Sequence, residues 1–240
     1  MAISKQLKKI LLKLTCRPFV HFIGEILAYL MRPKRSFQKR LKSFRQAKRL
    51  NSNKFIIGLH VRRTDGLISK AKSHSLAEYI DVAEDIFQRL NSLKQLQSFK
   101  NVMVKRKIYL ATDEIDVWRT EVPSFKRKGY QFVGEIEHTK TAAPVQRFQI
   151  ESYENFLLDV YALSRKDYRV CTLNSHLCRL AYELIQIDRD YDMSQNVISL
   201  DDVYYFGGQR PHRLVATVIN DNKDKIVPKQ LASDLIQDKR

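Results

Sequence analysis

Positive and polar side chains follow an apolar stretch within residues 55–65, Phe-Ile-Ile-Gly-Leu-His-Val-Arg-Arg-Thr-Asp. The adjacent Arg62 and Arg63 suit an anion such as phosphate, because a planar guanidinium donates to two oxygens at once. The alternative interpretation is a pair of solvated arginines. The apolar, β-branched residues before them predict a buried strand over 54–61. Charge at the end of such a strand lies at the rim of a sheet, where ligands bind in open α/β folds.

Two later strand-like segments also end in polar residues. The segment Lys-Ile-Tyr-Leu-Ala-Thr-Asp predicts a strand that ends in Asp113, with Glu114 next to it. Residues 167–171 predict another strand, which a turn at 172–175 joins to a helix over 176–187. Because the N–H groups at the start of a helix attract anions, this strand–turn–helix unit is a ready anion site.

The elements that position these clusters alternate between helix and strand. Ser75 and Glu78 form a capping-box pattern ahead of a helix with apolar residues at helical spacing. We also expect helices over 17–32, 34–50, 114–122 and 147–165, strands over 107–113, 129–133 and 213–219, and loops over 66–75 and 134–146. Asp159 lies within the helix 147–165 on a mostly apolar stretch, where an unpaired carboxylate is costly, so it should have a partner or a ligand.

This alternation predicts an α/β fold, a Rossmann-like doubly wound parallel sheet with helices on both faces. Neither Gly-x-Gly-x-x-Gly nor a P-loop pattern occurs in the sequence. A phosphate site would therefore use arginine and a helix N-terminus in place of a glycine-rich loop.

Composition bounds the remaining possibilities. The 240 residues suit one large domain, and a hydrophobic content of 44% supports a real core. The net charge of +17 makes nucleic-acid binding an alternative class, although no RNA-recognition or zinc-finger pattern supports it.

The sequence contains no secretory signal and no spanning segment, because the longest apolar run, 18–31, is short and holds a glutamate. The spacing of Cys171 and Cys178 is compatible with two buried thiols or with a disulfide that closes a small loop. Cys16, the third cysteine, would then be without a partner cysteine.

Four segments together resemble a known family. They are His60-Val-Arg-Arg-Thr-Asp65, Tyr109-Leu-Ala-Thr-Asp113, Asp167-Tyr-Arg-Val-Cys-Thr172 with Cys178-Arg-Leu-Ala-Tyr-Glu183, and Ser199-Leu-Asp-Asp-Val-Tyr-Tyr-Phe-Gly-Gly-Gln209. In this order and with nearly ungapped spacing, they resemble the α-1,6-fucosyltransferases of glycosyltransferase family 23, which add core fucose to N-glycans. The likeness runs from about Arg17 to Arg213.

The resemblance implies a function and an architecture. It implies transfer of fucose from GDP-fucose to the core GlcNAc of an N-glycan or glycoprotein, with inversion, without a metal and without a further cofactor. It also implies the nucleotide-binding half of a two-lobed, GT-B-like glycosyltransferase that works in the Golgi lumen. The resemblance does not decide whether the protein forms a dimer. We expect no nucleic-acid partner.

The resemblance also assigns roles to residues. Arg62 would stabilise the charge that builds on the β-phosphate of GDP as fucose leaves, with Arg63 in support. His60 and Asp159 would hold the guanine, and Ser175 would lie by the phosphates. Further positions that match family residues supporting activity are Asp65, Tyr79, Asp113 and Glu114. Cys171 and Cys178 match a family disulfide, which implies an oxidising lumen.

The chain departs from the family pattern in the loop after Asp65. The family's general base, a glutamate five residues beyond that aspartate, is Lys70 here, and its lysine directly after the aspartate is Gly66. A protonated lysine cannot remove a proton from an acceptor hydroxyl. A catalytically inactive relative that binds GDP or GDP-fucose is therefore the alternative to an active transferase.

Three parts of the chain are expected. Residues 1–53 form a basic helical segment, and 54–212 form a Rossmann-like GDP-fucose-binding domain. Residues 213–240 are a tail that corresponds at most to a remnant of the family's SH3-like domain.

Overall fold

The structure is a computed structural model that describes residues 5–11, 18–50, 55–63, 73–98, 104–142, 146, 148–188 and 196–201. The expectations for Cys16, Asp65, Gly66, Lys70 and the strand 213–219 lie outside these residues.

Five parallel strands form a single sheet in the order β3-β2-β1-β4-β5. They are β1 (Ile57–Val61), β2 (Lys107–Thr112), β3 (Gln131–Val133), β4 (Tyr168–Cys171) and β5 (Val197–Ser199). This order is that of the Rossmann fold, in which the chain reverses direction across the sheet between β1 and β4. The predicted fold class is confirmed, and so are the first four strands.

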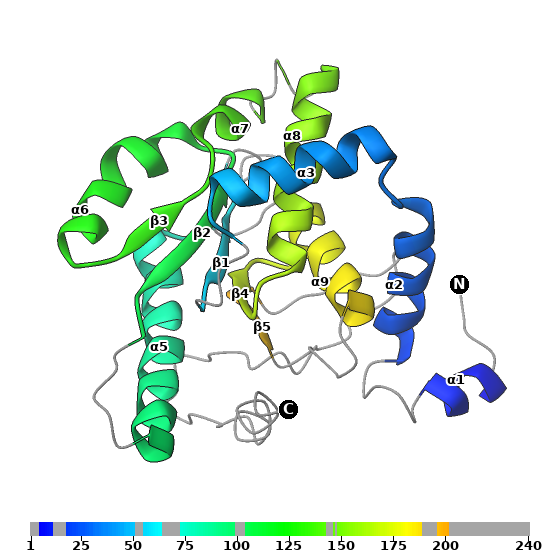
Figure 1. The fold of residues 1–240 in the computed structure, drawn as a ribbon, viewed down its shortest axis with the longest axis horizontal. Coiled ribbons are helices and arrows are strands. Elements are labelled where there is room, and N and C mark those ends of the chain that lie inside the picture. The colour runs from blue at the N-terminus through cyan, green and yellow to red at the C-terminus, as the bar shows by residue number, and fades with distance from the viewer. Residues whose placement is uncertain are drawn as a thin grey trace.

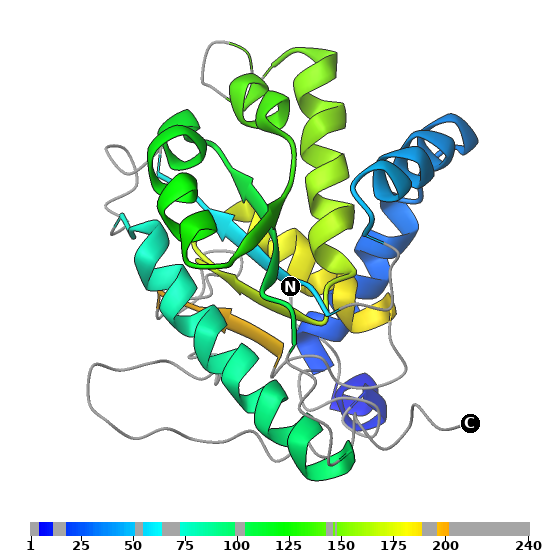
Figure 2. The same cartoon turned by 60° about the vertical axis from the view of Figure 1, so that its left-hand side comes forward.

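Helices cover both faces of the sheet (Figures 1 and 2). On one face lie α5 (Leu76–Ser98), the π-helix η1 (Val117–Glu121) and α6 (Val122–Arg127), and on the other lie α8 (Ile150–Ser164) and α9 (His176–Asp188). The strands alternate between the faces: Ile57, Leu59 and Val61 pack toward α5, whereas Ile56 lies in the cluster that contains residues of α8 and α9.

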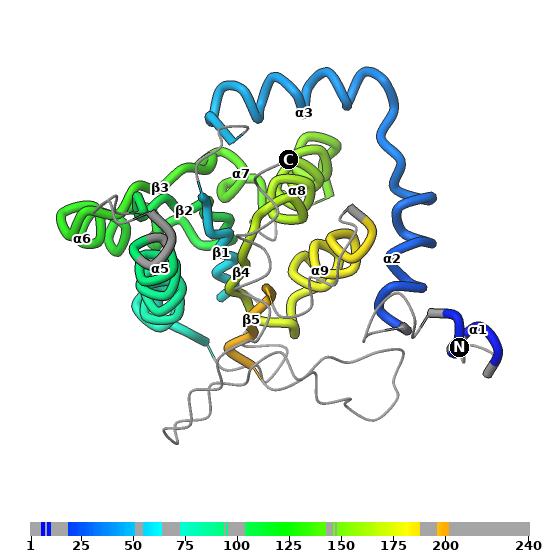
Figure 3. The backbone as a smooth tube through the Cα atoms, turned by 60° about the horizontal axis from the view of Figure 1, so that its bottom comes forward, coloured from blue at the N-terminus to red at the C-terminus, as the bar shows by residue number. Residues whose placement is uncertain are grey.

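The N-terminal helices pack on the second layer. After the short α1 (Lys5–Leu11), α2 (Pro18–Leu30) runs beside α9, and α3 (Arg35–Ala47) crosses α8 (Figure 3). A β-carbon at Gly24 would stand 2.3 Å from the carbonyl oxygen of Glu183, so the close approach of α2 to α9 requires glycine there. The two predicted helices are confirmed, and they lie against α8 and α9.

Two local predictions were wrong, and one predicted helix forms but differs in its type and its end. Residues 134–146 were expected to be a loop, but α7 (Ile136–Thr141) forms there. The helix expected over 114–122 is the π-helix η1, which continues into α6. The edge strand β5 was not expected, because a run of three residues is too short to show period-two alternation.

The capping box at the start of α5 is confirmed. The backbone N–H of Ser75 donates to Glu78 Oε1 at 2.9 Å, and the N–H of Glu78 donates to Ser75 Oγ at 3.3 Å. This cap fixes the start of α5.

Candidate functional site

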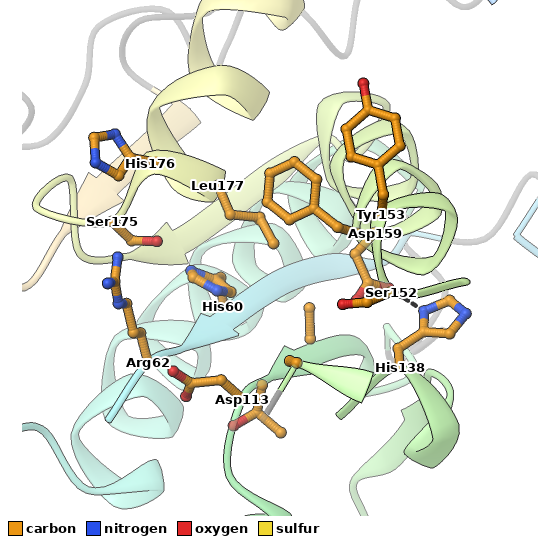
Figure 4. A pocket seen from close by; sticks show the side chains of 14 residues that line it. His60, Arg62, Asp113, His138, Ser152, Tyr153, Asp159, Ser175, His176 and Leu177 are labelled. Atoms are coloured by element: carbon orange, nitrogen blue, oxygen red, sulfur yellow. Dashed lines mark hydrogen bonds and ion pairs between the residues drawn. The ribbon is translucent and has the colours of Figure 1, made fainter. Parts of the chain in front are cut away.

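A pocket of about 270 Å³ opens at the carboxyl ends of the strands, beside the switch point between β1 and β4. It is lined by residues of β1, β2, α7, α8 and α9: His60, Arg62, Ala111, Thr112, Asp113, His138, Ala142, Ser152, Tyr153, Phe156, Asp159, Ser175, His176 and Leu177. We call the side of Arg62, Asp113, Ser175 and His176 the arginine end, and the side of His138, Ser152, Tyr153 and Asp159 the aspartate end (Figure 4).

Arg62 and the start of α9 form the arginine end. Arg62 follows β1 directly, and its guanidinium points toward Ser175 (Figure 4). Ser175 is 1% exposed and precedes α9, so its hydroxyl lies where the helix presents its first N–H groups. Burial lowers the pKa of His176, and the positive charges of Arg179 and Arg62 lower it further. The cationic groups at or beside this end are thus the guanidinium groups of Arg62 and Arg179.

The turn after β4 already holds an anionic group, which is a carboxylate of the chain itself. Asp201 accepts from the N–H of Leu173 at 2.8 Å and from the N–H of Asn174 at 2.9 Å. Ser199 Oγ also contacts the Asp201 carboxylate and accepts from the N–H of Leu173 at 3.1 Å. The expectation that the amides of this turn serve a ligand is thus wrong for Leu173 and Asn174.

Arg63, the neighbour of Arg62, does not line the pocket. Its Nη1 and Nη2 lie 2.5 and 3.1 Å from the two carboxylate oxygens of Glu121 in η1. Its Nε donates to the carbonyl of His74 at 3.0 Å, and Glu114 lies 3.5 Å from Nη1. The hydrogen bond to Glu121 raises the pKa of Arg63. Arg63 therefore ties the end of β1 to η1 and to the segment before α5.

Two carboxylates complete this tie. Asp113 Oδ1 accepts from the backbone N–H of Arg63 at 2.9 Å, and Glu121 Oε2 accepts from the N–H of Leu76 at 2.9 Å. Asp113 lines the pocket, whereas Glu114 does not. Glu121 was not predicted from the sequence, and no motif there marks it.

Asp159 is the centre of the aspartate end. It is 7% exposed, and its Oδ1 accepts from the hydroxyl of Tyr109 at 2.5 Å and lies 2.7 Å from Nδ1 of His138. The expectation that this carboxylate has a partner is confirmed. Burial, followed by the charge of Asp159, raises the pKa of Tyr109, so its hydroxyl stays protonated and donates.

His60 stands between the two ends and is 5% exposed. Burial lowers its pKa from 6.5 to about 4, although Asp113 and Asp159 act in the opposite direction. Among the described residues, its Nδ1 has no hydrogen-bond partner. His60 thus lines the pocket as a buried imidazole, and its unpaired Nδ1 lies out of reach of solvent.

Tyr79 lies beneath the switch point and does not line the pocket. The side chain is fully buried, with its hydroxyl against Thr172 after β4 and the backbone of Arg62 after β1. No described residue meets that hydroxyl at hydrogen-bonding geometry. Burial raises the pKa of Tyr79, which keeps the hydroxyl protonated.

Cys171 and Cys178 are joined by a disulfide in the structure, and their Cα atoms lie 6.2 Å apart. The bond links the end of β4 to the first turn of α9 across the turn 172–175. It therefore holds Ser175 and the start of α9 against the sheet.

The order of the strands, the helices on both faces and the polar pocket at the switch point define a Rossmann-type α/β domain. The family profile described as "Alpha-(1,6)-fucosyltransferase N- and catalytic domains" matches residues 1–205. The chain belongs to this family of α-(1,6)-fucosyltransferases.

Relatives in two animals are similar over most of the chain. The α-(1,6)-fucosyltransferase of Drosophila melanogaster is 34% identical over 212 residues, which are 88% of this chain and 32% of the fly protein. That of Caenorhabditis elegans is 34% identical over 223 residues, 92% of this chain and 37% of the nematode protein. The chain thus spans about a third of the length of these curated relatives.

One solved structure is a more distant likeness. It is titled a crystal structure of NodZ α-1,6-fucosyltransferase soaked with GDP-fucose, and it shares 18% identity with a TM-score of 0.34. The alignment covers 63% of this chain and 42% of that one.

Two features are absent from the part of the chain that the structure describes. Within the described ranges, no group of three or more histidine, cysteine, aspartate or glutamate residues is arranged to hold a metal ion. None of the described helices combines the length and apolarity that a membrane span requires.

Proposed function

We propose that this chain carries the donor site of an α-(1,6)-fucosyltransferase and that the pocket binds GDP-fucose. The reaction proposed is transfer of fucose to the core GlcNAc of an N-glycan, with inversion at the sugar carbon and without a metal. Residues 54–212 would form the donor domain of a two-lobed enzyme, preceded by the helical segment 1–53 and followed by the tail 213–240. The disulfide suits an oxidising compartment such as the Golgi lumen.

The observation that carries this proposal is the polarity of the pocket. One end presents Arg62 and the start of α9, which suit a diphosphate. The other end presents Asp159, a buried acceptor, with the unpaired nitrogen of His60 between the two. A nucleoside diphosphate has the matching order of groups, because its phosphates are anionic and a guanine edge carries adjacent N–H donors.

In the proposed reaction, the bond from the fucose carbon to the β-phosphate oxygen breaks and its electron pair stays on GDP, while a hydroxyl oxygen of the acceptor GlcNAc forms the new bond to that carbon from the opposite face and releases its proton to solvent. Arg62 would stabilise the negative charge that develops there, as preorganised donors do. Asp113 and Glu114 would act indirectly, because they hold the backbone and side chain of Arg63 next to Arg62. Tyr79 would support the floor of the site between Arg62 and Thr172.

Calorimetric titration with GDP tests the donor site. We expect the wild-type chain to bind GDP and Arg62→Ala to bind at least ~30-fold more weakly, because a charged partner of the phosphate is lost. Arg106→Ala is the control, because Arg106 forms an ion pair with Glu84 away from the pocket. Equal affinity for GDP in Arg62→Ala and wild type would reject the proposed site.

A non-catalytic relative that binds GDP-fucose is the second candidate. The specific observation is that Lys70 and Gly66 stand where the family has a glutamate and a lysine. A transfer assay with an N-glycan acceptor separates the two candidates. Turnover by the wild type that Arg62→Ala abolishes supports the enzyme, whereas GDP binding with turnover only in Lys70→Glu supports the non-catalytic relative.

A further inference from the structure

The carboxylate of Asp159 is held on one side only. Both of its hydrogen bonds, from Tyr109 and His138, go to Oδ1, and among the described residues Oδ2 has no partner. Asp159 lines the pocket, so Oδ2 is the oxygen left for a ligand. An ionised carboxylate only accepts, and each oxygen offers about two acceptor positions.

Both donors are themselves fixed by their surroundings. Tyr109 is fully buried in β2. His138 is 7% exposed in α7, and its ring stacks on Phe44 of α3 with centroids 5.3 Å apart and an interplanar angle of 23°. The ring of Tyr109 cannot turn without opening the core, and the stack on Phe44 restrains the ring of His138.

The helix that carries His138 is fastened at its middle and at its C-terminal end. Trp118 Nε1 of η1 donates to Thr139 Oγ1 at 3.1 Å. Ser152 Oγ of α8 donates to the carbonyl of Thr141 at 2.7 Å, and Asn155 Nδ2 donates to Thr141 Oγ1 at 3.2 Å. His138 therefore has a defined position relative to Asp159, which also lies in α8.

We propose that Tyr109 and His138 are positioning residues that occupy Oδ1 of Asp159 and so turn Oδ2 toward a purine whose edge offers adjacent N–H donors. This inference rests on the proposed GDP site. Guanine offers N1–H and an exocyclic NH₂ on one edge, whereas hypoxanthine offers N1–H alone and adenine places an acceptor at N1. A fixed carboxylate therefore selects GDP over IDP and excludes ADP, and a carboxylate free to rotate selects less well.

The test is a calorimetric comparison of GDP, IDP and ADP on the whole chain. We expect wild type to prefer GDP over IDP by ~10-fold or more, the value of one hydrogen bond to a charged group. In Tyr109→Phe and His138→Ala this preference should fall to ~3-fold or less, mainly through weaker GDP binding. His138→Asn, whose amide can replace the Nδ1 donor, should restore part of it.

Matched controls are available elsewhere in the molecule. His74 is 5% exposed, and its Nδ1 lies 2.7 Å from Oε2 of Glu78. Tyr130 is 8% exposed, and its hydroxyl donates to Oε2 of Glu84 at 2.7 Å. Neither residue lines the pocket. His74→Ala and Tyr130→Phe should keep the preference for GDP over IDP. They report what the loss of a part-buried histidine–carboxylate or tyrosine–carboxylate pair does to the fold alone.

The outcomes are distinct. A GDP preference that falls in the two pocket variants and stays in the controls supports the inference. Affinities for GDP, IDP and ADP that change by one common factor in His138→Ala overturn it and leave the GDP site in place. If folded wild type does not bind GDP, the proposed function fails and the inference fails with it.

Discussion

The two ends of the pocket are built in different ways. At the arginine end, the ligand-facing residues lie next to strand and helix ends, and the carboxylates of Asp201 and Asp113 accept from backbone N–H groups beside them. At the aspartate end, Asp159 is held by side chains from β2 and α7. The carboxylates at the arginine end hold the backbone, whereas the side chains around Asp159 orient one carboxylate. We therefore expect changes at the arginine end to cost stability and affinity, and changes at the aspartate end to cost selectivity.

The largest expected effect is on stability, at the arginine end. Asp201→Ala removes the acceptor of two backbone N–H groups, so the free energy of unfolding should fall by ~3 kcal/mol. Urea denaturation measures this, with Asp116→Ala as a control because Asp116 is exposed and lies outside this turn. A loss for Asp201→Ala no larger than that of the control would contradict the different roles of the two ends.

The next prediction concerns His60, which stands between the two ends. The pKa of His60 in the folded chain is about 4, below the ordinary value of 6.5. Between these two values of pH, His60 is protonated in the unfolded chain and neutral in the folded chain. The contribution of His60 to stability is therefore complete above pH 6.5 and decreases as the pH falls toward 4. Between pH 7 and pH 5 wild type should lose ~2 kcal/mol more than His60→Gln does.

Denaturation of both proteins at each pH measures this difference. Asp113, Asp159 and Arg62, the charged groups that face His60, are present in both wild type and His60→Gln, so the difference between the two proteins isolates His60. If the two stability curves run parallel from pH 7 to pH 5, His60 is not held neutral by burial. The site would then lack the unpaired neutral nitrogen on which the middle of the pocket depends.

The sequence predicted the arginine end better than the aspartate end for a physical reason. Arg62 and Ser175 lie next to strand and helix ends, and those ends show in local patterns such as an apolar run followed by charge. Those patterns do not reveal which of two adjacent arginines faces the pocket, because the contact of Arg63 with Glu121 joins residues 58 positions apart. Long-range pairs of this kind form only once the fold is in place.

The aspartate end depends on an element that the sequence concealed. The segment 134–146 has few apolar residues at helical spacing and was expected to be a loop, yet α7 forms there and carries His138. Packing against α8 and η1 stabilises this six-residue helix, which is too short to be stable alone. The burial of Asp159 was the one signal that a partner had to exist, although it could not identify His138 or Tyr109.

The smallest predicted effect tests whether this packing orients His138. Trp118→Phe keeps an aromatic ring but removes the hydrogen bond from Nε1 to Thr139, a residue that is 2% exposed. The free energy of unfolding should fall by about 1 kcal/mol, the ordinary net value of a hydrogen bond between uncharged groups, with a further small loss from the smaller ring. The preference for GDP over IDP should decline at the same time, because α7 carries His138.

A double-mutant cycle with Thr139→Val isolates the contact from the change in ring size. If Trp118 acts through this hydrogen bond, the double variant should lose less stability and less GDP selectivity than the sum of the two single variants. Strictly additive losses would mean that Trp118 fills space without holding α7. The aspartate end would then owe its geometry to the contacts of α7 with α8, and the cycle should be repeated on Ser152→Ala, whose hydroxyl donates to Thr141.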